Sequence, residues 1–94
     1  MPLGPTVSTA ANVAGSATAV TIFAAATNAV ASRSVFNDST AVLYLKKGAS
    51  ASTTDHWVQI PAGGYFEFPQ PCWPGLVSGI WPTATGSART TEDS

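Results

Sequence analysis

The sequence is short of charge and of cysteine. Charged residues make up 10% of its 94 residues, whereas a typical soluble domain has about 25%. The only cysteine is Cys72, so a disulfide within the chain is impossible. Nucleic-acid binding depends on many contacts from Lys and Arg to phosphates. With a net charge of −1, this composition argues against a nucleic-acid partner; its scattered bases are Arg33, Lys46, Lys47 and Arg89.

The residues that catalytic and metal sites require are scarce as well. His56 is the only histidine, and a zinc site needs three or four converging His, Cys or carboxylate ligands. The core carboxylates, Asp38, Asp55 and Glu67, show no pairing suited to glycoside hydrolysis, and no G-x-S-x-G nucleophile turn is present. We therefore expect no enzyme activity, no cofactor and no metal.

Long apolar stretches are also lacking. Residues 17–31 are the best candidate for a membrane span, but they include Thr18, Thr21, Thr27 and Asn28. A span needs about 20 mostly apolar residues. No basic residue precedes Arg33, so we expect neither a secretory signal nor a membrane partner.

Small residues dominate the start of the chain, and aromatic residues dominate its middle. Residues 1–17 contain no charge and no aromatic ring, and all nine aromatic residues lie within residues 18–81. A segment made of small and polar residues, such as residues 1–17, cannot bury enough apolar area to offset the entropy lost when it becomes ordered. We predict an extended N-terminal arm over residues 1–17, with Val7 and Val13 as interface candidates, and a folded domain over residues 18–94.

Short alternating apolar segments separated by turn residues indicate β-strands. Asn37–Thr40 and Pro61–Gly64 have the composition of turns. The expected strands are Thr18–Ala24, Ser34–Asn37, Ala41–Lys46 (buried on both faces), Trp57–Ile60, Tyr65–Phe68, Leu76–Trp81 and Ser87–Thr91. Six or seven such strands predict an all-β fold, a small antiparallel β-sandwich of jelly-roll or immunoglobulin-like type. A helix between Ala10 and Ser32 is the alternative, which Gly15 and the many threonines disfavour.

Several aromatic side chains are predicted to point outward from strands or to lie in loops. Trp57 and Tyr65 alternate with inward apolar residues, and Trp73 lies in a proline-rich loop that offers little cover for an indole. Exposed rings anchor protein interfaces or stack on sugars. We treat Trp57, Tyr65 and Trp73 as candidate interface residues; the alternative is that the rings cap the open ends of the sandwich, which we favour for Trp81.

Four segments of the second half follow one known pattern: Val35–Lys46 with its continuation Gly48–Ser52, Ile60–Pro69, Gly79–Trp81 and Ala84–Glu92. Through them, residues 34–92 resemble a family of short bacteriophage virion-associated structural proteins. The resemblance implies a compact β-sandwich that joins a particle during assembly in the host cytoplasm. For such a role in a virion, we expect the major capsid protein or other virion proteins as partners, and a homotrimer. The matching segments mark strands and turns, so no catalytic residue is carried over.

Three functions remain open at this point. The first is a capsid decoration (cement) protein, which stabilises the shell through subunit contacts. The second is a component of the tail, neck or fibre, which would be present in far fewer copies per particle. The third is a carbohydrate-binding module for host attachment, with Trp57, Tyr65 and Trp73 as a sugar platform.

Overall fold

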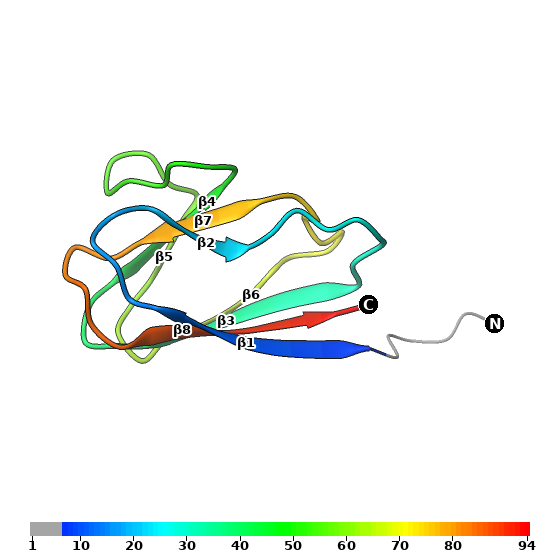
Figure 1. Ribbon diagram of the computed structural model, residues 1–94, viewed down its shortest axis with the longest axis horizontal. Coiled ribbons are helices and arrows are strands. Elements are labelled where there is room, and N and C mark those ends of the chain that lie inside the picture. The colour runs from blue at the N-terminus through cyan, green and yellow to red at the C-terminus, as the bar shows by residue number, and fades with distance from the viewer. Residues whose placement is uncertain (1–6) are drawn as a thin grey trace.

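The computed structural model describes residues 7–94, which form eight β-strands and no helix (Figure 1). The strands are β1 Ser8–Ala14, β2 Val20–Phe23, β3 Ser32–Asp38, β4 Leu43–Lys47, β5 Val58–Ile60, β6 Tyr65–Glu67, β7 Val77–Ile80 and β8 Ser87–Asp93. Antiparallel pairing joins them into sheet A, in the order β1-β8-β3-β6, and sheet B, in the order β2-β7-β4-β5. The predicted β-sandwich is confirmed, with eight strands in place of six or seven. The choice between the jelly-roll and immunoglobulin-like types stays a prediction.

Strand β1 occupies much of the segment that we expected to be an arm. It pairs along its whole length with β8, from Ser8 opposite Asp93 to Ala14 opposite Ser87. The prediction of an extended arm over residues 1–17 is therefore wrong for residues 8–14, and residues 1–6 lie outside the described range. Composition misled because six of the seven residues of β1 are exposed, and main-chain pairing to β8 holds the strand without large side chains.

The core lies between the two sheets and consists of apolar side chains from both. Leu43 and Leu45 of β4 are fully buried, while Tyr44 between them is only half-buried. The prediction that this strand is covered on both faces is therefore wrong, because sheet B buries one face and leaves the other partly open. The remaining core residues are Ile22, Phe23, Val35, Ile60, Phe68, Cys72, Val77, Trp81 and Ala88.

Asn37 and Trp81 are buried more deeply than the sequence predicts. The sequence predicts Asn37 as the last residue of a strand and the first of a turn; it lies within β3, and its side chain is completely buried. Trp81, which we expect to cap an open end of the sandwich, is also completely buried. The sequon Asn37-Asp38-Ser39 is thus closed to glycosylation in the folded chain, because the amide that would carry the sugar is inside the core.

Candidate interaction surfaces

Two of the predicted interface residues, Trp57 and Trp73, come together around Lys47. The Lys47 ammonium lies 4.4 Å from the ring centroid of Trp57 and 5.7 Å from that of Trp73. These residues come from the end of β4, the residue before β5 and the loop between β6 and β7. Cation–π attraction acts at such distances. We call Lys47, Trp57 and Trp73 the aromatic–lysine patch.

Within this patch, Trp57 is half-buried and not directed outward as predicted. Its ring packs edge-on against Phe66 and Phe68, with centroid distances of 5.3 and 5.1 Å. Because β5 is the last strand of sheet B and β6 the last of sheet A, these three rings close the sandwich on that side. Trp57 therefore supports the patch from beneath and leaves only part of its surface for a partner.

Trp73 is the exposed member of the patch, with 38% of its surface accessible. Its indole N–H donates to the Leu76 carbonyl over 3.2 Å. A Cβ at Gly75 would lie 2.6 Å from Cζ2 of the indole, so the ring rests directly on the glycine backbone. The exposed ring is held in one orientation before any partner arrives, which reduces the entropy that binding must overcome.

Arg33 fixes the loop that carries Trp73. Its guanidinium is fully buried and donates to the carbonyls of Trp73 and Gly75 at 3.0 and 2.7 Å, and to those of Ala24 and Pro74 at 3.0 and 3.1 Å. Nε donates to Glu92 Oε2 over 2.7 Å. Sequence reasoning counted Arg33 among scattered surface bases. Arg33 lies two residues before Val35 in β3, and residues two apart in a strand point to the same face. Because apolar residues of a strand are expected to point inward, this alternation with Val35 could have placed Arg33 inside.

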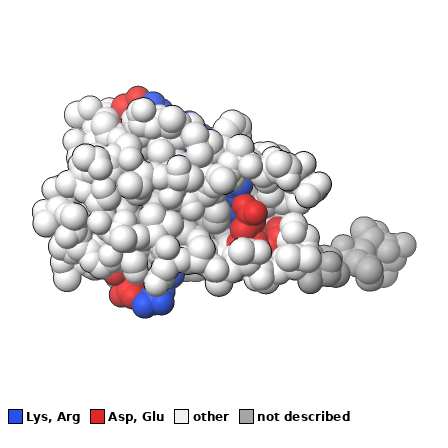
Figure 2. All heavy atoms as spheres, viewed as in Figure 1, with Lys and Arg blue, Asp and Glu red and all other residues white. Residues whose placement is uncertain are grey.

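Charged side chains are sparse on the surface of the folded chain. Most of the face seen in Figure 2 carries no Lys, Arg, Asp or Glu atoms. Three ion pairs occur among residues 7–94, and they join Arg33 to Glu92, Lys46 to Asp55, and Arg89 to Asp38. Lys47 takes part in none of them, so within the described range the aromatic–lysine patch offers a cation without a carboxylate.

The other predicted interface residues lie elsewhere. Tyr65 of β6 is 62% exposed and stands opposite Phe36 in the β3–β6 ladder. Neighbouring strand residues point to opposite faces, and the next residue, Phe66, packs on Trp57. Tyr65 therefore faces away from the aromatic–lysine patch, and the three predicted rings do not form a single platform.

The two valines of the expected arm are placed by β1. Val13 is half-buried and packs against the core. Val7 is exposed and exchanges main-chain hydrogen bonds of 2.9 and 2.8 Å with Ser94. Both valines therefore belong to the ladder between β1 and β8, on the far side of sheet A from β6.

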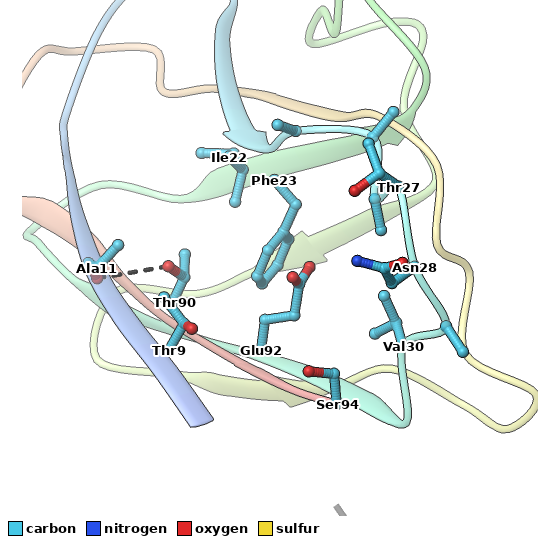
Figure 3. A pocket seen from close by; sticks show the side chains of 14 residues that line it. Thr9, Ala11, Ile22, Phe23, Thr27, Asn28, Val30, Thr90, Glu92 and Ser94 are labelled. Atoms are coloured by element: carbon cyan, nitrogen blue, oxygen red, sulfur yellow. Dashed lines mark hydrogen bonds between the residues drawn. The ribbon is translucent and has the colours of Figure 1, made fainter. Parts of the chain in front are cut away.

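A hollow of about 380 Å³ opens beside β1 (Figure 3). Its walls include Thr9 and Ala11 of β1, Phe23 of β2, Val30 of the following loop, and Thr90 and Glu92 of β8. The Glu92 carboxylate is held by Arg33. Sequence reasoning missed the hollow because its walls come from segments far apart in the sequence.

The other side chains that could take part in catalysis or metal binding show no reactive arrangement among residues 7–94. His56 Nδ1 lies 3.1 Å from the Ser52 carbonyl oxygen, and its ring packs on Tyr44. Cys72 is buried, and burial raises the pKa of its thiol. Within residues 7–94, no three His, Cys, Asp or Glu side chains gather as metal ligands, and no helix could cross a bilayer.

Comparison of the chain with protein-family models, with curated proteins and with solved structures gives no match. Function is therefore inferred from the residues themselves.

Proposed function

We propose that this chain is a structural protein of a bacteriophage virion, and specifically a capsid decoration protein that stabilises the shell through subunit contacts. The resemblance of residues 34–92 to short virion-associated proteins supports the assignment of the chain to a bacteriophage particle. The aromatic–lysine patch supports a role in contact. The partner would be the major capsid protein or another virion protein, met during assembly in the host cytoplasm. A place in the tail, neck or fibre is the alternative within the same class.

The observation that carries the proposal is the fixed and exposed indole of Trp73 next to Lys47. Tryptophan is among the residues that most often dominate the energy of a protein interface, with losses of about 2 kcal/mol or more on truncation. A carboxylate on the shell could pair with Lys47 while an apolar side chain covers the indole. Many weak contacts of this kind, repeated over a shell, hold a small protein firmly when its copies are linked.

The sparse charge on the surface favours the same role. Solubility in small proteins depends largely on charged side chains, and this chain has few of them. A surface of Ala, Ser, Thr and Gly tolerates close packing against other molecules. Nucleic acid and membrane are not partners in this proposal, and the homotrimer expected for a decoration protein stays a prediction.

The test is to restore the protein to particles that lack it. Virions made without the gene are mixed with the purified chain and sedimented, and the bound chain is quantified over a range of concentrations. We expect saturable binding by the natural chain, a loss of about tenfold or more in affinity for Trp73→Ala, and unchanged binding for Tyr65→Ala. Absence of binding by the natural chain would refute the proposal.

A second titration distinguishes capsid decoration from the alternative function, carbohydrate binding. Polysaccharides from the host surface are added while the tryptophan fluorescence is followed. Decoration predicts no saturable change, whereas a saturable change that Trp73→Ala removes would move the function to carbohydrate recognition.

A further inference from the structure

Strand β1 leaves one side of its backbone without a partner. It is the outermost strand of sheet A, and only β8 pairs with it among the described residues (Figure 1). Val7 exchanges both of its main-chain hydrogen bonds with Ser94. Bonding alternates along an antiparallel ladder, so Thr9, Ala11 and Val13 bond to β8 like Val7. The N–H and C=O groups of the even-numbered residues, from Ser8 to Ala14, therefore point away from the sheet.

The other three sheet edges are protected in ways that β1 is not. Natural proteins block edge pairing with short strands, bulges, prolines or charges. The edge strands β5 and β6 have three residues each, and β2 has four residues with a shift of register. Strand β1 has seven residues in unbroken register, without proline or charge. Of the four edges, β1 alone suits the addition of another strand.

From this edge we infer that two copies of the chain pair antiparallel through their β1 strands, across a two-fold axis at Ala11. The outward groups of the two copies meet only if even-numbered residues face even-numbered residues. Full overlap then sets Ser8 opposite Ala14 of the second copy, and Ala10 opposite Asn12 of the second copy. Each such pair exchanges two main-chain hydrogen bonds, which joins the two copies of sheet A into one continuous sheet.

The composition of β1 points to a second copy as the occupant. A two-fold contact places the same strand against itself, so any charge in it would face a like charge nearby. Strand β1 contains only Ser, Thr, Ala, Asn and Val. The three charged residues on β8, Arg89, Glu92 and Asp93, are each separated from the second copy by the width of β1. The contact shares no residue with the aromatic–lysine patch, so it goes beyond the proposed function and does not depend on it.

The register gives a sharp cross-linking test. Ala11 and Ala11 of the second copy form a pair without hydrogen bonds between them, where Cα atoms lie about 4.5 Å apart. That distance falls within the range of about 4.4–6.8 Å that a disulfide requires. Ala10 is the matched control, because it faces Asn12 of the second copy and its side chain points to the other face of the sheet.

Both cysteines are introduced separately into a Cys72→Ala background, and mild oxidation is followed by non-reducing electrophoresis. We expect a covalent dimer for Ala11→Cys and little for Ala10→Cys. Equal cross-linking of both variants, or none for Ala11→Cys, would overturn the inference.

Native mass spectrometry of the unmodified chain over a dilution series provides the second test, with Ala10→Pro as the variant. Proline removes an outward N–H, which an edge strand tolerates, but it blocks strand addition. We expect a mass of two chains for the natural protein and for Ala10→Ser, and of one chain for Ala10→Pro. A natural protein of one chain, or of three chains as in the predicted homotrimer, would contradict the two-fold contact, as would a dimer of Ala10→Pro.

Discussion

The indole N–H of Trp81 donates a hydrogen bond to Asn37 Oδ1 over 3.1 Å, in a position where both side chains are completely buried. Asn37 Nδ2 donates to the carbonyls of Ala41, Ile60 and Pro61 at 2.8, 2.9 and 3.1 Å. One side chain of sheet A therefore satisfies an indole and the backbone of two turns. Unpaired polar groups are costly in a core, so this amide fixes how the two sheets meet.

Replacing Asn37 should therefore destabilise the fold strongly. Asn37→Ala removes the acceptor of the buried Trp81 N–H and a donor to the Ile60 carbonyl, whereas the Ala41 and Pro61 carbonyls keep Ser39 Oγ and the Gly64 N–H as donors. We expect a loss of about 2–4 kcal/mol in the free energy of unfolding. Asn28→Ala, in an exposed loop, should change it by less than about 0.5 kcal/mol. Urea titration followed by tryptophan fluorescence measures both, and equal midpoints for the two variants would show that the buried amide has no special role.

Arg33 should stabilise the two loops at residues 24–31 and 69–76 through its hydrogen bonds, and not through its charge alone. The ammonium of a lysine has three donors and cannot satisfy the four carbonyls that the guanidinium binds, and a buried polar group left unsatisfied costs about 1–3 kcal/mol. We expect Arg33→Lys to be destabilised in that range, with faster amide exchange in residues 24–31 and 69–76. Arg89→Lys is the control, because its pair with Asp38 is largely exposed and exposed pairs contribute about 0–1 kcal/mol. Unchanged exchange in both loops would contradict the role given to Arg33.

Lys47 and Lys46 are neighbours with different expected roles in particle binding. Lys47 lies beside the two indoles without an ion pair in residues 7–94, whereas Lys46 binds Asp55. We expect Lys47→Gln to weaken binding to particles by about three- to tenfold and to reduce its dependence on salt. Lys46→Gln should bind normally in the same sedimentation assay. The opposite ranking of the two variants would move the contact away from the aromatic–lysine patch.

The Cys72 thiol should make the fold lose stability in alkaline solution. Burial raises the pKa of this thiol in the folded chain above its ordinary value of 9.0. The unfolded chain then loses the thiol proton at lower pH than the folded chain, so stability falls as the pH rises past that value. Comparing urea midpoints of the natural chain and Cys72→Ala between pH 7 and 10.5 measures this, and the gap should shift in favour of Cys72→Ala at high pH. A constant gap would contradict it.

Some strands could be predicted because the apolar and turn residues within each segment identify it. The continuous apolar run of residues 41–45 predicts β4, and the turn at Pro61–Gly64 separates two alternating segments, so β4, β5 and β6 fall close to their predicted positions. Strand β1 was missed because its pairing with β8 depends on main-chain groups, which composition does not reveal.

The candidate site was predicted in part, for a different reason. Trp73 was placed correctly in an exposed loop because prolines leave few ways to bury it. The burial of Trp57 and Trp81 was missed because it depends on how the two sheets close against each other. The meeting of Lys47 with Trp57 and Trp73 is a contact between distant segments, and alternation along one strand cannot predict it.

The most direct test of the account is a count of this chain in purified virions. Particles from the phage that encodes it are isolated on a density gradient, and quantitative mass spectrometry compares the chain with the major capsid protein. We predict that the chain is present in numbers comparable to the capsid subunits, far above those of tail proteins. Its absence from purified particles, although infected cells contain it, would contradict the account.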